Sequence, residues 1–186
     1  YGRKPLLIIA AILFTVSAVA TGVFDDFTLF NIARFVGGIG IGIASALSPM
    51  YIAEISPSAI RGKLVSLNQM TIVLGILGAQ IANWLIAEDV PSSFGSTEIL
   101  SSWNGQMGWR WMFWAEAVPA SLFLVLAFFI PESPRWQVLR GYQSQAQATL
   151  THIGGEEYAH AEMESIRQSV NADASAEKAG FKTLSS

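Results

Sequence analysis

Four long stretches of the chain carry almost no charge. They are residues 5–24, 35–53, 64–87 and, with Glu116 as the one charged residue, 111–131. A helix that crosses the hydrocarbon core of a bilayer needs about 20 predominantly apolar residues, and each stretch has close to that length. The sequence therefore predicts an all-α membrane protein with four transmembrane helices. The predicted helices cover about residues 5–24, 29–53, 62–87 and 110–130.

The overall composition excludes several other classes of protein. Only 13% of the 186 residues are charged and 52% are hydrophobic, whereas about a quarter of a soluble domain is charged. The net charge of -3 provides no basic surface for phosphates, so we expect no nucleic-acid partner. The chain has no cysteine, which excludes a disulfide scaffold, thiol catalysis and a Cys-ligated metal.

The first apolar stretch also resembles a secretory signal peptide. Arg3 and Lys4 precede it, and Ala18-Val19-Ala20 imitates a cleavage site. We favour a membrane span, because the apolar run is long for a signal peptide and three more spans follow.

Basic residues gather in alternate connections between the predicted spans. On one side lie Arg3, Lys4, Arg61, Lys63, Arg135 and Arg140. The other side carries Asp25, Asp26, Glu88, Asp89 and Glu98, with Arg110 as its base. Lys and Arg accumulate on the cytoplasmic side of short loops. We therefore expect a multi-pass protein of the plasma (inner) membrane, with its N-terminus and its tail in the cytoplasm.

The remaining segments are more polar. Residues 88–109 form a predicted outer loop, and the tryptophans close to its end are typical of an interfacial belt. These are Trp103, Trp109, Trp111 and Trp114. In the tail, apolar residues recur at helical spacing, as in Ala146, Leu150 and Ile153 and in Ala159, Met163, Ile166 and Val170. We predict short amphipathic helices over 137–170 and an irregular linker over 171–186.

Two charged residues lie within the predicted spans. Arg34 is about five residues inside the second span and Glu116 about seven inside the fourth, both counted from the outer side. At about 1.5 Å per residue both groups lie ~8–10 Å below that surface, so they can be level with each other. An arginine at the centre of a membrane costs about 2.5–3.5 kcal/mol and normally faces a cavity or a partner. The alternative is that the Arg34 side chain extends outward to the lipid headgroups.

Neutral amides follow one face of the third predicted span. Gln69, Ile76, Gln80 and Asn83 have the spacing of a single helical stripe. An amide offers both a donor and an acceptor to sugar hydroxyls without the desolvation of a charge. Hydrogen bonding between helices is the alternative. We favour that alternative for Gln80 and Asn83, and the residues alone do not decide for Gln69.

Pairs of glycines lie within the second and third spans. Gly38 and Gly42, and likewise Gly75 and Gly78, form faces of small residues that allow helices to approach closely. We predict a packing role for both pairs.

Three motifs give the chain a family resemblance. They are RFVGGIGIG at 34–42, PMYIAEISPSAIRGK at 49–63 and PESPRW at 131–136, with GRK at 2–4 as a partial fourth. Together they resemble the sugar porter family of the major facilitator superfamily over about residues 1–170. The runs LVSLNQ at 64–69 and MFWAE at 112–116 are especially similar to its bacterial proton-coupled members.

The resemblance implies a fold and an activity. The four spans, within residues 1–136, would be helices 3 to 6 of a twelve-helix transporter, and residues 137–170 would begin its intracellular helical domain. Helices 1 and 2 and the C-terminal half would then be partners of this chain. The transporter would move a monosaccharide, xylose- or glucose-like, across the bilayer by alternating access, in symport with protons and without a cofactor.

The resemblance also implies roles for single residues. Gln69 would bind the sugar and Ile76 would line the same site, where xylose symporters have glutamine and animal glucose uniporters have isoleucine. Arg34 and Glu116 would take part in proton coupling. A cytoplasmic gate between the two halves would comprise Arg3, Glu54, Arg61, Glu132 and Arg135.

Other functions remain open at this point. A facilitative sugar uniporter would keep the same arginine, and a sugar sensor that does not transport would keep the same fold. An enzyme is disfavoured, because the sequence has neither HExxH nor a nucleophile–base pair, and His152 and His160 lie in the polar tail.

Overall fold

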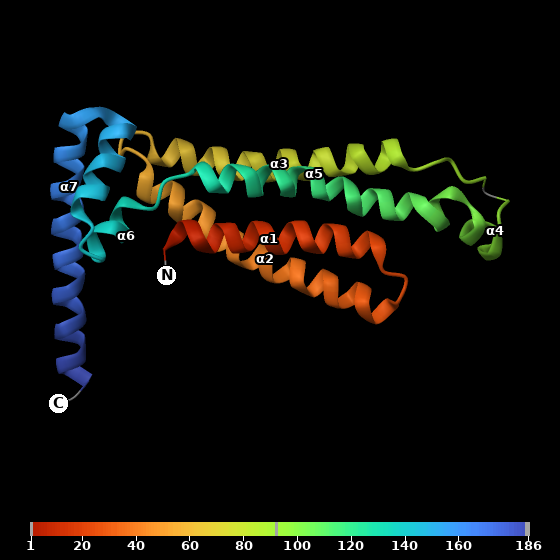
Figure 1. Ribbon diagram of the computed structural model, residues 1–186, viewed down its shortest axis with the longest axis horizontal. Coiled ribbons are helices and arrows are strands. Elements are labelled where there is room, and N and C mark those ends of the chain that lie inside the picture. The colour runs from red at the N-terminus through yellow and green to blue at the C-terminus, as the bar shows by residue number, and fades with distance from the viewer. Residues whose placement is uncertain (1, 92, 185–186) are drawn as a thin grey trace.

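The computed structural model describes residues 2–91 and 93–184. Its four long helices lie side by side in a bundle, and α7 runs across one end of that bundle (Figure 1). The long helices are α1 (Arg3–Val23), α2 (Phe27–Ile55), α3 (Arg61–Ile86) and α5 (Trp109–Phe129), and α6 (Pro134–Leu139) and α7 (Gln143–Leu184) follow.

The helices confirm the predicted fold class. Four are long and apolar enough to cross a membrane: Arg3–Val23, Phe27–Ile55, Arg61–Ile86 and Asn104–Phe129. The ends of the first three agree with the predictions to within two residues. The fourth begins earlier, because a π-helical turn, η1 (Asn104–Gly108), continues directly into α5.

Helix α1 packs through small side chains. Its buried residues are Leu7, Ala10, Ala11, Ser17, Ala18, Thr21 and Gly22. With the half-buried Phe14 between Ala11 and Ser17, they follow the three- and four-residue spacing of one helical stripe, and α1 contacts both α2 and α5. Small side chains allow close approach of backbones, which is how membrane helices gain contact without a hydrophobic driving force.

The glycines that pack α2 against α1 are not those that were predicted. A Cβ atom on Gly37 would overlap the side chain of Ser17, and one on Gly40 would lie 3.1 Å from the carbonyl oxygen of Ala10. Among the described residues, no atom lies within 4 Å of a Cβ built on Gly38 or Gly42, and the same holds for Gly75 and Gly78. The prediction was wrong within this chain, because spacing identifies a stripe of glycines but not which way that stripe faces.

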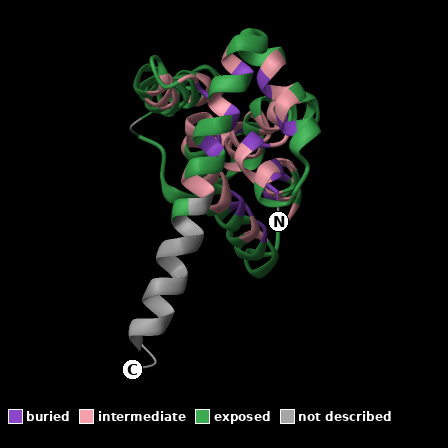
Figure 2. Ribbon diagram, turned by 90° about the vertical axis from the view of Figure 1, so that its left-hand side faces the viewer, coloured by how far each residue is buried: buried purple, intermediate pink, exposed green. Residues whose placement is uncertain are grey.

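Helix α3 differs from its neighbours because none of its described residues is buried. Figure 2 shows the buried residues inside the bundle and on the inner side of the helices that cross its end, with exposed residues over the outside. The tightly packed unit of the bundle is therefore α1 with α2 and α5.

The predicted outer loop contains ordered structure that the sequence reading missed. A short helix, α4 (Ser96–Ser101), precedes η1. The Asn104 side chain accepts from the backbone N–H of Glu88 at 2.9 Å and donates to its carbonyl at 2.7 Å. Trp103 donates to the carbonyl of Ile86 at 3.1 Å. These bonds attach the start of the fourth span to the end of α3.

The C-terminal end of α1 is held by α5. Arg110 donates to the carbonyl of Gly22 at 2.8 Å and forms an ion pair with Asp25. The indole of Trp114 donates to the carbonyl of Val19 at 3.3 Å, and its ring occupies the space that a Cβ on Gly22 would need. A cation near the last carbonyls of a helix is favourable, so Arg110 stabilises this end of α1.

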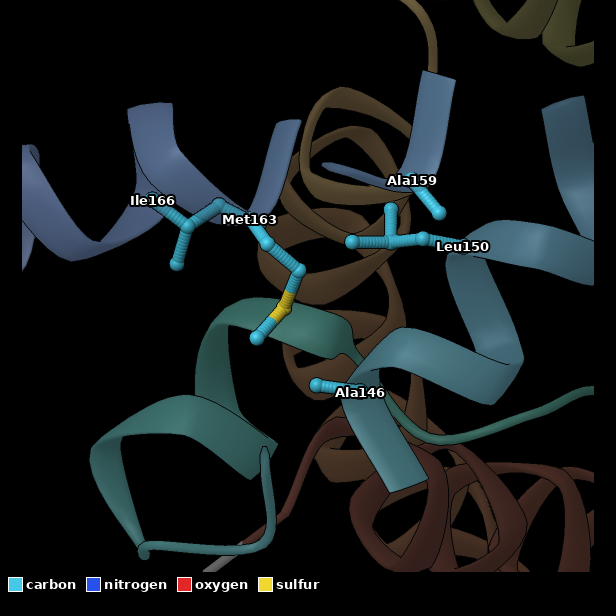
Figure 3. Close-up of a cluster of buried hydrophobic side chains, with 5 residues drawn as sticks. All are labelled: Ala146, Leu150, Ala159, Met163 and Ile166. Carbon is cyan, nitrogen blue, oxygen red and sulfur yellow. The ribbon is translucent and has the colours of Figure 1, made fainter. Parts of the chain in front are cut away.

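Helix α7 consists of two arms that fold back on each other. The break is at Gly155, whose φ of 85° is a conformation that glycine adopts without a steric penalty. The arms enclose a hydrophobic cluster of Ala146, Leu150, Ala159, Met163 and Ile166 (Figure 3). The predicted stripes form this contact, except that Ile153 is 37% exposed.

The segment 171–186 was predicted to be an irregular linker. The structure instead continues α7 to Leu184, and residues 185–186 lie outside the described residues. The reason is composition, since the alanines, glutamate and lysines of this segment have high helix propensity even without an apolar stripe.

Candidate functional site

The two charged residues of the spans meet between α2 and α5. Arg34 Nη1 lies 3.3 Å from Glu116 Oε2, and the pair is only partly covered, with the side chains 44% and 51% exposed. The structure brings the two groups to one level, as the estimate of their depth predicts. Because the bilayer core has no water to solvate a lone charge, pairing reduces the cost of placing both groups in a span.

The pair lines a cleft between the helices. This cleft, of about 670 Å³, is also lined by Ile76 and by glycines of α2 and α3, among them Gly38 and Gly75. The absent side chains of the unpacked glycines therefore leave room beside the ion pair. Among the described lining residues, Arg34 and Glu116 are the charged ones, so they dominate the electrostatics of the cleft.

Gln69 lies in a second cavity. That cavity, of about 540 Å³, has a neutral polar lining that includes Ser48, Ser66 and Asn68 together with Gln69. Ile72 lines both cavities, so they adjoin along α3. Gln69 and Ile76 are two turns apart, about 10 Å along the helix axis. Ile76, and not Gln69, thus lines the cleft that contains the ion pair.

At the other end of the bundle, Arg3 joins α1 to α2. Its guanidinium makes two bonds to the carboxylate of Glu54, at 2.9 and 3.3 Å. Ser133, a fully buried residue before α6, donates to the same carboxylate at 2.6 Å. Two-point pairing of arginine with a carboxylate fixes geometry as well as charge. Ser133 was not found by sequence reasoning, which considered only the charged residues of the motif.

Glu132 binds the backbone rather than a basic side chain. Its Oε1 atom accepts from the N–H groups of Arg3 at 2.7 Å, Lys4 at 3.1 Å and Ser133 at 2.9 Å. The first two are unsatisfied amides of the start of α1, so Glu132 acts as the N-terminal cap of that helix. A Cβ on Gly2 would overlap this carboxylate, so a larger residue there would require the Glu132 side chain to move.

Arg61 connects the start of α3 to α7. Its Nη2 atom lies 3.7 Å from Glu162 Oε1 and donates to the carbonyl of Ser56 at 3.4 Å, while its buried Nε has no hydrogen-bond partner among the described residues. Arg61, Arg135 and Glu162 line one cavity of about 370 Å³. Sequence reasoning also did not identify Glu162, although it directly precedes Met163 of the predicted apolar stripe.

The electrostatics of this end extend to Tyr158. Partial burial raises the pKa of the Tyr158 hydroxyl, the carboxylate of Glu162 raises it further and Arg61 lowers it.

No group of three or more His, Asp or Glu side chains within the described parts of the chain could hold a metal ion.

Four helices long and apolar enough to cross a membrane, with a charge pair beside a cleft between them, define a multi-pass membrane protein. The chain belongs to the sugar (and other) transporter family, whose sequence model matches residues 1–186. It is an integral membrane protein and not an enzyme.

Named relatives support this assignment. The chain is 41% identical to the D-xylose-proton symporter of Escherichia coli (strain K12), over 92% of this chain and 37% of that protein. It is 44% identical to a glucose transport protein of Synechocystis over 83% of this chain and 32% of that protein. It is 38% identical to the arabinose-proton symporter of Bacillus subtilis over 91% of this chain and 35% of that protein.

Solved structures agree. The partially occluded inward-open xylose transporter XylE from E. coli matches 91% of this chain and 40% of its own, with 40% identity and a TM-score of 0.79. The proton:xylose symporter XylE of the major facilitator superfamily, bound to 6-bromo-6-deoxy-D-glucose, matches 91% of this chain and 38% of its own, with 40% identity and a TM-score of 0.80. The chain spans less than half the length of these relatives.

Proposed function

We propose that this chain forms helices 3 to 6 of a secondary active transporter that moves a monosaccharide in symport with protons. The observation that carries the proposal is the ion pair of Arg34 and Glu116 between two membrane-spanning helices, in a cleft that Ile76 also lines. Two of the relatives described above are named as proton symporters of sugars. Helices 1 and 2 and a C-terminal half would complete the protein.

The pair provides a way to couple a proton to movement. When Glu116 takes up a proton it loses its charge, so the coulombic attraction that holds Arg34 is lost. In the proton-coupled members of the family that the chain resembles, this arginine pairs with an aspartate on helix 1, and we propose that Arg34 then pairs with such a residue. Because each partner favours a different arrangement of the helices, protonation shifts the balance between inward- and outward-facing states.

The sugar is proposed to bind through Gln69. Its cavity combines hydroxyl and amide groups, and none of the described lining residues is charged, which suits a neutral polyol. This cavity adjoins the cleft of the ion pair at Ile72, so occupancy of one can influence the other.

The ion pairs and hydrogen bonds at the end of the bundle next to α6 and α7 are proposed to act as the gate. The chain's N-terminus and tail would then lie in the cytoplasm. Exposed ion pairs contribute about 0–1 kcal/mol each. Arg61 and Glu162 form a partly exposed pair, 3.7 Å apart, that joins α3 to α7. A weak tie of this kind suits a switch, because alternating access needs two states of similar free energy.

A facilitative uniporter is the second candidate, and Ile76 favours it. An isoleucine cannot hydrogen-bond a sugar, and this one lies in the cleft beside the ion pair. The glucose transport protein of Synechocystis, whose name includes no proton, is also a relative.

Uptake in proteoliposomes separates the two candidates. We expect the full-length protein to take up labelled D-xylose or D-glucose faster as the outer pH falls, because protons drive the cycle. Glu116→Gln removes the titrating group and should flatten this dependence. An identical pH profile in the variant would contradict the coupling role of Glu116, and pH-independent uptake in both would favour the uniporter. Glu157→Gln, on the exposed surface of α7, is the matched control.

A further inference from the structure

Arg34 has a second neighbour on α5 that no motif indicated. The ring of Phe113 lies under its guanidinium, with Arg34 Cζ 5.0 Å from the ring centroid. Phe113 and Glu116 are three residues apart, so they occupy neighbouring positions on the same side of the helix. A guanidinium within about 6 Å of an aromatic face is attracted to it. Arg34 therefore has two anchors, and only Glu116 can titrate.

The ring of Phe113 is itself held in place. Phe30 meets it edge-on, with centroids 5.6 Å apart, and Trp109 does so at 6.3 Å. Phe30 and Trp109 also contact each other edge-on at 6.2 Å. Edge-to-face contacts of this kind are the favoured arrangement of aromatic pairs. Because Phe30 lies one turn before Arg34 on α2, the cluster fixes the ring relative to both helices.

We propose that Phe113 is a positioning residue that keeps Arg34 at the cleft when Glu116 is neutral. Its consequence for transport rests on the proposed function. Among the described residues that line the cleft, α1 and α3 contribute only uncharged side chains. The other cation of the aromatic cluster, Arg110, lies over Trp109 at 4.5 Å and pairs with Asp25. Within the described chain, the Phe113 ring is thus the anchor of Arg34 that protonation leaves unchanged.

Chemical modification of Arg34 tests the proposal without depending on transport. The full-length protein in lipid nanodiscs is treated with phenylglyoxal, and adduct formation at Arg34 is followed by peptide mass spectrometry. Glu116→Gln represents the neutral state. We expect Phe113→Leu in that background to raise the modification rate about 2- to 5-fold, which corresponds to the attraction at a partly exposed site. Phe113→Tyr should leave the rate close to that of Glu116→Gln alone.

Two controls keep the result interpretable. Phe129→Leu removes a ring from the same helix at a position that is 80% exposed, and it should not change the rate. Phe113→Met preserves the apolar volume and serves as the second variant if Phe113→Leu does not fold. Equal rates at Arg34 with and without the Phe113 ring would overturn the proposal.

Sugar uptake shows the functional consequence. We expect the ratio of wild-type to Phe113→Leu uptake to rise as the pH falls, because more Glu116 is then neutral. A ratio that is the same at every pH would contradict positioning and indicate general loss of packing. Faster modification of Arg34 after Phe113→Leu, together with no sugar transport by the wild-type protein, would refute the proposed function and leave the positioning role standing.

Discussion

Glu132→Ala should destabilise the protein through the start of α1. One carboxylate oxygen accepts three backbone N–H groups, two of them from Arg3 and Lys4. Loss of an N-cap acceptor costs about 1 kcal/mol, and loss of negative charge beside a helix N-terminus costs about 0.3–1 kcal/mol. The bond to Ser133 contributes about 1 kcal/mol more. We therefore expect the free energy of unfolding to fall by about 2–3 kcal/mol.

Conservative variants divide this loss into its parts. Glu132→Gln keeps an acceptor oxygen and loses the charge, so it should cost only about 0.3–1 kcal/mol. Gly2→Ala places a Cβ where the carboxylate lies and should reproduce part of the Glu132→Ala effect. Glu157→Ala removes an equal charge from the exposed surface of α7 and should have no effect.

Thermal unfolding of the purified full-length protein, followed by tryptophan fluorescence, measures these differences. We expect the apparent Tm to fall by several degrees for Glu132→Ala and by less for Glu132→Gln. The reasoning is refuted if Glu132→Ala unfolds at the same temperature as Glu157→Ala. Equal decreases in Tm for Glu132→Ala and Glu132→Gln would instead show that only the charge of Glu132 matters. That result would fit an ion pair with a part of the protein outside this chain.

The other predictions concern the bundle, the sugar cavity and the gate. Gly37→Ala should lower the Tm more than Gly38→Ala, because its Cβ overlaps Ser17 whereas that of Gly38 meets open space; equal shifts would contradict the packing of α1 on α2. Gln69→Ala should weaken sugar binding, measured by sugar-dependent thermal protection, and unchanged affinity would remove Gln69 from the site. Arg61→Ala should reduce the outward-facing population about 2- to 5-fold, because the ion pair with Glu162 contributes about 0.5–1 kcal/mol. Glu162→Ala should give the same result in accessibility labelling.

The spans and their charge pair were predictable from the sequence because helical geometry is regular. The uncharged stretches fixed the number of crossings, and the rise per residue placed Arg34 and Glu116 at one depth before any contact was known. Family motifs then indicated which charges at the ends of the helices would form the proposed gate. Each of these inferences depends on position along a helix, which the sequence specifies directly.

Features that depend on how helices face one another were not predictable in this way. The spacing of glycines does not specify the rotation of α2, so it did not show that Gly37, and not Gly38, packs against α1. The resemblance placed Glu132 in the gate, but it did not indicate that this residue caps α1, which is remote in sequence. Phe113 was not identified, because one aromatic residue in an apolar span has no distinguishing signal until Arg34 is placed above it.

Sugar-induced proton movement is the most direct test of proton-coupled transport. The full-length protein is reconstituted into weakly buffered proteoliposomes without a pH gradient, and D-xylose or D-glucose is added outside. We predict that the outer medium becomes more alkaline as sugar enters, and that Glu116→Gln abolishes this change. Entry of labelled sugar with no accompanying proton movement in the wild-type protein would contradict the account.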